Sequence, residues 1–173
     1  SVCRSFRNRI YFIRRSRGYA PAPVKLAANY PNVLAVGAEL KNTVAINRGA
    51  HVFLSQYIGD LENAEVSASF EQAIQRMQEL FEITPALLAY DLHPEYLSTK
   101  YALNRRGELP LYGIQHHHAH IAACLAENGE RGPVIGLSLD GTGYGPDGRI
   151  WGGEVLVADL RDYERVGHFR DVP

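Results

Sequence analysis

The sequence contains no long apolar run, which excludes a membrane-spanning helix as its organising feature. A transmembrane helix needs roughly 18 or more consecutive apolar residues. The hydrophobic residues here make up 46% of the 173-residue chain but occur in short segments. The first residues, SVCRSFRNRIYFIRR, are basic but lack the apolar segment and cleavage site of a signal peptide. We therefore expect a globular protein in the cytoplasm, with no membrane partner.

Cysteine is also scarce. The chain has only Cys3 and Cys124, and neither belongs to a CxxC pair. Two cysteines are too few for a disulfide framework. We expect both thiols to be reduced.

Excess charge of one sign is absent, because the net charge is −1 at pH 7. This argues against nucleic-acid binding through bulk electrostatics. The exception is the N-terminus, whose first 17 positions contain no acidic residue and six arginines: Arg4, Arg7, Arg9, Arg14, Arg15 and Arg17. This basic end is either a solvated tail or charge-protected edge strand, or a surface that faces phosphate.

Proline and glycine divide the chain into segments. The run RIYFI predicts a strand, and the APAP that follows cannot continue a helix or a central strand. We interpret residues 18–31 as a linker. From Pro31 onward, the runs NVLAVGAEL, NTVAINRG and HVFLSQYIG predict three sequential strands in an antiparallel meander.

The middle of the chain predicts alternating helices and strands. In SFEQAIQRMQELFEI the apolar residues recur at helical spacing, at Phe70, Ile74, Met77 and Phe81. Ser69 and Gln72 suggest a capping box. ALLAYDLHP and LYGIQ predict strands, STKYALNRRG a short helix ending at Gly107, and HHAHIAACLAENGE a helix ending at Asn128 and Gly129. A second group of strands begins at Pro133.

The run QHHHAHIAAC, residues 115–124, contains four of the seven histidines. It lies at a predicted strand-to-helix junction, and the carboxyl ends of strands are where ligands bind in open α/β sheets. His116 and His120 are four residues apart, so a helix places both rings on one face, where they can share a metal ion. His117 pairs with His120 by i+3, whereas His118 points away and is a supporting or substrate-facing group. The alternative is a polar helix start with solvated histidines.

A third metal ligand must come from another segment, and Asp140 in LSLDGTGYG is the candidate because it ends a strand. The glycines after it would let backbone N–H groups approach a phosphate, which predicts a phosphate-binding turn at Gly141, Thr142 and Gly143. An ordinary hairpin turn is the alternative.

Two weaker turns also end in polar residues. In VGAELKNT, Lys41 and Asn42 could contact phosphate, although a hairpin turn explains the pattern equally well. In DLHPEYLST, Asp91 and His93 could enter the same cleft as the histidine run. The alternative there is a strand end followed by a helix cap at Ser98.

Seven segments in order, RRSRGYAP, AVGAELKNT, FLSQYIGDLEN, YDLHPEYLST, QHHHAHIAAC, DGTGYGPDGRIWGGE and ERVGHF, resemble the HypF carbamoyltransferase family, which matures nickel-iron hydrogenases. The resemblance covers nearly the whole chain. It implies that residues 1–24 are the C-terminal tail and linker of a YrdC-like α/β domain. It also implies that residues 32–173 are the N-terminal part of a TsaD-like domain. This domain has the α/β actin-like ATPase (ribonuclease H-like) fold, here its N-terminal half and the start of its second half.

The resemblance further implies a reaction and its participants. In this family, carbamoyl phosphate and ATP give carbamoyladenylate, and the carbamoyl group passes to the C-terminal cysteine of HypE, where it becomes a cyanide ligand of the hydrogenase. In TsaD-like domains the two histidines of an H-x3-H pattern hold a metal, zinc or iron, and they match His116 and His120. Asp140 matches a further ligand or nucleotide contact, with His117, His118 and His93 in support. Another acidic ligand of the family lies beyond the end of this chain, so we expect the fragment alone to be inactive.

Two other functions stay open at this point. One is a TsaD-like tRNA threonylcarbamoyl transferase, for which the basic first 17 residues would be the discriminating feature. RRSRGYAP and DGTGYG favour HypF over it. The other is a non-catalytic actin-fold module that binds a nucleotide. The expected partners are HypE and a nucleotide adenylate, and no nucleic acid is expected.

Overall fold

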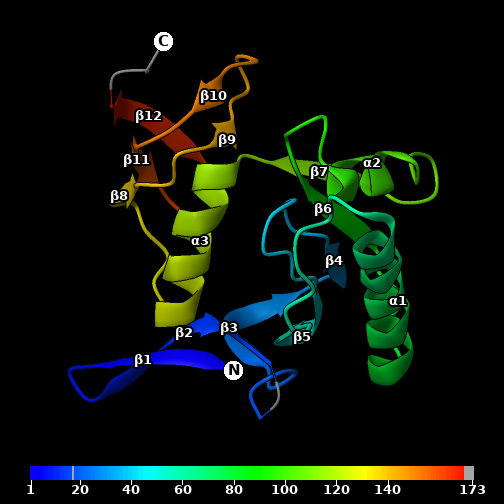
Figure 1. Cartoon of the computed structure of the whole chain (residues 1–173). Coiled ribbons are helices and arrows are strands. Elements are labelled where there is room, and N and C mark those ends of the chain that lie inside the picture. Colours follow the sequence, from blue (N-terminus) through cyan, green and yellow to red (C-terminus); the bar gives the residue numbers. More distant parts are fainter. Residues whose placement is uncertain (17, 170–173) are drawn as a thin grey trace. The chain divides into compact units, whose positions relative to one another are not determined.

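The computed structural model describes residues 1–16 and 18–169, so Arg17 of the basic N-terminus and residues 170–173 lie outside it. The chain divides into two compact units. The first unit comprises Ser1–Tyr90 and Tyr96–Tyr112, and the second comprises Asp91–Glu95 and the chain from Gly113 on. The described residues form a mixed α/β structure with several sheets (Figure 1). Among them, no helix combines the length and the apolar character needed to cross a bilayer.

The N-terminal segment is a hairpin of β1 (Val2–Phe6) and β2 (Arg9–Arg14), which pair antiparallel in a sheet of their own. Arg7 and Asn8 form its turn, and both have positive φ, as a tight two-residue hairpin loop requires. The strand predicted from RIYFI is therefore confirmed.

The main sheet of the first unit has the order β3-β5-β4-β6-β7. Its strands are β3 (Val24–Tyr30), β4 (Val33–Ala35), β5 (Ala45–Leu54), β6 (Leu87–Asp91) and β7 (Leu111–Ile114). β4 pairs antiparallel with β5 and parallel with β6.

Two predictions for this region are wrong. Residues 18–31 are not all linker, because β3 begins directly after Pro23, where the prolines no longer block the ladder. Of the expected three-strand meander, the first strand forms as β4, whereas the second and third runs join into one long strand, β5, which lies between β3 and β4. Gly49 lies within this strand with a positive φ of 57°, a conformation that glycine adopts without steric cost.

Helix α1 (Ala64–Phe81) buries the predicted stripe of Phe70, Ile74 and Met77 in the core of the first unit. The predicted capping box of Ser69 and Gln72 is wrong, because the helix begins six residues earlier. Its N-cap is Asn63, whose side chain accepts a hydrogen bond from the Val66 N–H.

Helix α2 (Leu97–Leu103) also departs from prediction at both ends. Its last residue is Leu103 and its C-cap is Asn104, so it ends before Gly107. Ser98 lies buried inside it and does not cap it. The N–H of Leu97 instead donates to the carboxylate of Glu39, 2.6 Å away, so a residue distant in sequence satisfies this end of the helix.

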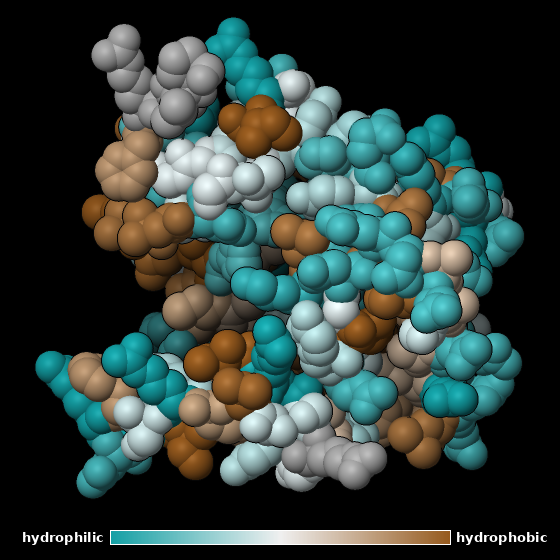
Figure 2. All heavy atoms as spheres, in the orientation of Figure 1, coloured by the Kyte–Doolittle hydropathy of each residue, from teal (hydrophilic) through white to brown (hydrophobic). Residues whose placement is uncertain are grey.

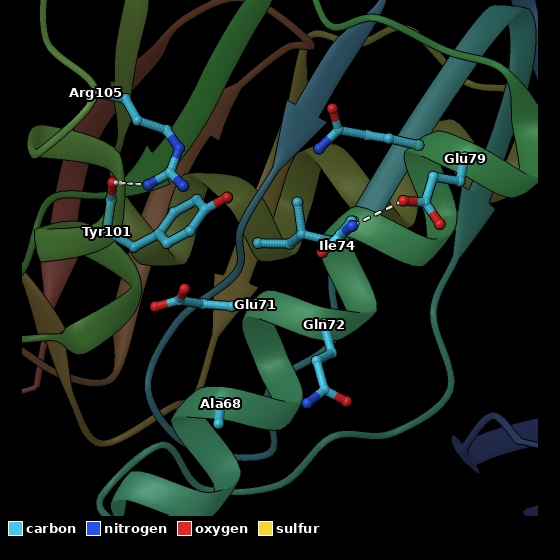
Figure 3. Close-up of a pocket in the computed structure, with 9 residues that line it drawn as sticks. Ala68, Glu71, Gln72, Ile74, Glu79, Tyr101 and Arg105 are labelled. Atoms are coloured by element: carbon cyan, nitrogen blue, oxygen red, sulfur yellow. Dashed lines mark hydrogen bonds between the residues drawn. The ribbon is translucent and has the colours of Figure 1, made fainter.

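The solvent side of α1 and the chain around α2 line an open groove of about 750 Å³ (Figure 3). Tyr101 packs edge-on against Phe70, and the Arg105 guanidinium lies 3.6 Å from the centre of the Tyr101 ring. Glu79 accepts a hydrogen bond from Gln75 on the same helix. None of the predicted site residues lines this groove. Its lining side chains make packing contacts and hydrogen bonds within and between α1 and the chain around α2.

The second unit contains α3 (His116–Asn128) and a sheet of order β12-β11-β8, formed by β8 (Val134–Ser138), β11 (Glu154–Ala158) and β12 (Tyr163–His168). A short hairpin of β9 (Gly143–Tyr144) and β10 (Ile150–Trp151) lies between β8 and β11 in sequence. This confirms the predicted second group of strands. The core of the unit joins the two layers through Ile121, Leu125, Leu156 and Ala158.

One face of β8 is covered and the other is not. Ile121 of α3 occupies the space that a Cβ at Gly136 would need, so the glycine allows close packing. The alternate residues Ile135 and Leu137 are exposed. Hydrophobic side chains gather over β8 in Figure 2. Within the described residues, β8 pairs only with β11, which leaves an apolar strand with an open edge.

Candidate metal centre

The histidine run opens α3 directly after β7, which confirms the predicted strand-to-helix junction. The N-cap is Gln115, whose side-chain oxygen accepts a hydrogen bond from the His118 N–H at 2.9 Å. The helix therefore begins at His116, and the histidines occupy its first two turns.

His116, His120 and Asp140 converge. The Nε2 atoms of His116 and His120 are 3.2 Å apart. Oδ2 of Asp140 lies 2.9 Å from His116 Nε2 and 3.3 Å from His120 Nε2. One donor atom from each of the three residues lies within 4.8 Å of the others. The structure thus brings together the three residues that the sequence predicted as metal ligands.

The chemistry of this donor set fits a divalent metal ion. Two imidazole nitrogens and one carboxylate oxygen are ligands that both zinc and iron accept. The His116 side chain is 16% exposed, whereas those of Asp140 and His120 are 44% and 57% exposed. The centre is therefore open on one side, as a site that must admit a substrate requires.

The electrostatics of the centre couple its three groups. A hydrogen bond to Asp91 raises the pKa of His116, against the opposing effect of burial, and Asp140 acts in the same direction. Burial acts to raise the pKa of Asp140, but the hydrogen bonds and charges of His116 and His120 together outweigh it and lower that pKa. Without a cation, both carboxylates therefore favour the protonated form of His116. A metal ion that binds this histidine competes with that proton.

Asp91 is a further residue of the site, whose contacts could not be predicted from the sequence. It ends β6 and is only 8% exposed. Its Oδ2 lies 2.7 Å from His116 Nδ1, and its Oδ1 accepts a hydrogen bond from the His93 N–H at 2.9 Å. The contact with His116 confirms the prediction that Asp91 enters the same cleft as the histidine run.

The other two histidines of the run are held elsewhere. His117 is fully buried, with Nδ1 3.1 Å from the Gln115 side-chain nitrogen, and burial lowers its pKa. His118 faces away, with Nε2 2.9 Å from the backbone oxygen of Asp159 and its ring against Tyr163. Their predicted supporting roles stay predictions.

His93 contributes its backbone to Asp91, as described above. Its ring packs against Tyr144 at 5.4 Å. Nδ1 of this ring accepts from the Glu95 N–H at 3.3 Å.

The glycine-rich turn after Asp140 has two kinds of glycine. A Cβ at Gly143 would lie 2.5 Å from Cε1 of His117 and 2.9 Å from Cβ of His116, so this glycine lets β9 pack against the histidine run. A Cβ at Gly141 would meet no atom within 4 Å. Only Gly141 and the exposed Thr142 therefore have open space beside them, and the phosphate role of the turn stays a prediction.

Lys41 and Asn42 belong to the first unit. Lys41 has a positive φ, and its backbone N–H donates to Asp60 at 2.7 Å. Asn42 is buried, and its side-chain amide donates to the backbone oxygens of Val36 and Ala38. These bonds explain the turn without a ligand, so contact of Lys41 and Asn42 with phosphate stays a prediction.

A groove of about 600 Å³ begins at His120 and Asp140 and runs between α3 and β8. Ile121, Cys124 and Leu137 are among its lining residues. Both Cys124 and Cys3 are free and exposed, as expected for reduced thiols.

These features define an α/β domain in which the start of a helix presents two histidines to an aspartate from the turn after a strand. Residues 28–127 match the family described as the HypF Kae1-like domain, and residues 136–173 match the second subdomain of the carbamoyltransferase Kae1-like domain. The chain belongs to the HypF family.

Individual relatives agree. The chain is 48% identical over 166 residues to carbamoyltransferase HypF2 of Cupriavidus necator, covering 95% of this chain and 21% of the relative. It is 44% identical over 162 residues to carbamoyltransferase HypF of Rhizobium leguminosarum, covering 94% and 21%. The chain thus spans about a fifth of the length of these relatives.

Solved structures show the same similarity. The crystal structure of full-length HypF in the phosphate- and nucleotide-bound form superposes with a TM-score of 0.89 at 45% identity, covering 93% of this chain and 21% of that one. The crystal structure of T. kodakarensis HypF superposes with a TM-score of 0.88 at 40% identity, covering 97% and 22%.

Proposed function

We propose that this chain is part of a HypF-type carbamoyltransferase and contributes a metal centre to the site where the carbamoyl group is transferred. The convergence of His116, His120 and Asp140 carries this proposal, because it places a carboxylate beside two imidazole rings, which bind metal ions in their neutral form. Family membership supports carbamoyl transfer, because the relatives that match are named carbamoyltransferases.

The proposal extends to the fold and its boundaries. Residues 1–24 would be the tail of a YrdC-like domain and its linker, and residues 32–173 the N-terminal part of a TsaD-like domain with the actin-like ATPase fold. The second sheet, which follows the first after α3, supports such a repeated architecture. The β1–β2 hairpin, with a sheet of its own, is compatible with a separate domain tail.

The proposed reaction starts from carbamoyl phosphate and ATP, which give carbamoyladenylate, and ends with the carbamoyl group on the C-terminal cysteine of HypE. A zinc or iron ion bound at the centre would supply Lewis-acid stabilisation of negative charge on the adenylate. His116 and His120 would hold the ion with neutral Nε2 atoms, and Asp140 would offset its charge. The open backbone at Gly141 and Thr142 would leave room for a phosphate beside the centre.

The tRNA-modifying alternative has less support. The relatives that match with 37–48% identity all have the HypF name. The net charge of −1 gives no general attraction to RNA.

Metal analysis of the purified chain tests the centre. We expect the chain to bind about one zinc or iron ion, and His116→Ala and His120→Ala each to lose it. His51→Ala is the matched control, because His51 is an exposed histidine of β5 in the first unit. Equal metal content in all four proteins would overturn the assignment.

Carbamoyl transfer is tested in a chimera, in which this segment replaces the matching part of the Cupriavidus necator relative. With labelled carbamoyl phosphate, ATP and HypE, we expect the chimera to label HypE and its His120→Ala variant to lose most of that labelling. A chimera that forms carbamoyladenylate yet labels tRNA and leaves HypE unlabelled would favour the alternative function.

A further inference from the structure

Asp91 makes two hydrogen bonds that together fix its carboxylate. Oδ1 accepts from the His93 backbone N–H at 2.9 Å, and Oδ2 lies 2.7 Å from His116 Nδ1. The residue is nearly buried at the end of β6, so little water competes for these bonds. One oxygen thus holds the carboxylate in place while the other meets the histidine.

The contact to Asp91 sets the tautomer of His116. An ionised carboxylate only accepts hydrogen bonds, so His116 Nδ1 must carry a proton to bond with it. In the neutral ring the lone pair then lies on Nε2. Nε2 is the atom that faces Asp140 Oδ2 and His120 Nε2.

We propose that Asp91 is a positioning residue, which holds the His116 ring in the orientation and tautomer that present Nε2 to a metal ion. This inference rests on the proposed metal centre and adds a residue outside its three ligands. Carboxylates that accept from the second nitrogen of a ligating histidine raise metal affinity by roughly 10- to 100-fold.

Asp91→Asn is the informative substitution, because an amide has one accepting oxygen whereas the Asp91 carboxylate uses two. If that oxygen stays on the His93 N–H, the amide NH₂ faces His116 Nδ1 and favours the tautomer with the proton on Nε2, directed at the centre. If the amide turns over, the bond to His93 is lost and the side chain is less firmly held. Either orientation weakens the presentation of Nε2.

The experiment measures zinc and cobalt affinity of the purified chain by competition with a chromophoric chelator. We expect Asp91→Asn to bind each metal about 10- to 100-fold more weakly than the original chain. Asp147→Asn is the matched control. Asp147 also accepts two N–H bonds in the second unit, from Arg149 and Trp151, and neither of these partners belongs to the proposed centre.

A second measurement separates positioning from general destabilisation. Long-range ¹H–¹⁵N NMR of histidine-labelled zinc-bound protein reports which ring nitrogen carries the proton. We expect the Nδ1–H form for His116 in the original chain and in Asp147→Asn, and loss of that signal or a mixture of forms in Asp91→Asn.

The outcomes distinguish this inference from the proposed centre. If His120→Ala loses the metal while Asp91→Asn keeps full affinity and the Nδ1–H form, the positioning role is wrong and the centre stands. If His120→Ala also keeps full affinity, the centre itself is wrong. A metal-bound His116 with the proton on Nε2 in the original chain would also overturn the inference.

Discussion

Replacing Gly143 by alanine should damage both the fold of the second unit and its metal centre. The added Cβ would lie 2.5 Å from Cε1 and 2.8 Å from Nδ1 of His117, and 2.9 Å from Cβ of His116. His117 is fully buried and cannot swing away, so β9 and the start of α3 must separate. Overpacking of this kind costs about 1–3 kcal/mol of unfolding free energy.

The same displacement should weaken metal binding, because His116 is part of the contact. A shift of a few tenths of an ångström at its Cβ moves Nε2 relative to Asp140 and His120. We expect zinc affinity to fall about tenfold, which corresponds to about 1.4 kcal/mol. Urea unfolding at equilibrium measures the first effect, and chelator competition measures the second.

Gly141 provides the matched control in the same turn. A Cβ there would meet no atom within 4 Å, so Gly141→Ala should change the unfolding free energy by less than about 0.5 kcal/mol. If Gly143→Ala proves as stable and as zinc-competent as Gly141→Ala, then the packing of β9 against the histidines is not what requires glycine at 143.

Three further predictions concern pH, an ion pair and association. In the metal-free chain, the raised pKa of His116 contributes stability that is present below the ordinary pKa of 6.5 and is lost as the pH rises through the raised pKa. The unfolding free energy from urea titrations should therefore decline between pH 5 and 9, and His116→Ala should remove this decline. Arg165→Met should lower the unfolding free energy by about 3–5 kcal/mol in the same assay, because it leaves the fully buried Glu154 carboxylate without the guanidinium that lies 2.6 Å away. Glu154→Gln should cost less, because its side-chain oxygen still accepts from Arg165. Equal losses of unfolding free energy would contradict this reasoning. Leu137→Lys should reduce self-association of the chain in sedimentation velocity, because it places a charge on the exposed apolar face of β8. Leu40→Lys makes the same change at an exposed leucine of the first unit and should leave self-association unchanged.

Local patterns in the sequence predicted the elements that carry the centre. The helix 116–128, the strand before it and the strand that precedes Asp140 all form where the apolar runs and glycines indicated. The H-x3-H spacing places its two rings together on any helix, so that pair follows from local geometry alone.

The failures occur where a distant residue replaces a local signal. Leu97 starts α2 without a cap of its own, because Glu39 accepts its N–H. Asp91 lies beside the histidine run as predicted, but its bond to His116 could not be predicted locally, because it depends on β6 and β7 being neighbours in one sheet. The phosphate contact of Gly143 stays a prediction, but its close packing against His116 and His117 had no local signal in the sequence. Such pairings depend on strand order, which periodicity does not encode.

Helix geometry explains why two of the four histidines face Asp140 and the other two do not. Successive side chains rotate by about 100° around an α-helix, so His120 lies about 40° from His116, while His117 and His118 lie about 100° and 200° from it. His117 is therefore directed into the interior beside Gly143, and His118 toward Asp159 and Tyr163. Each of these two rings stabilises the start of α3 against a different part of the second unit. The density of the run thus reflects two tasks, since one pair of histidines faces Asp140 and the other two anchor the helix that presents them.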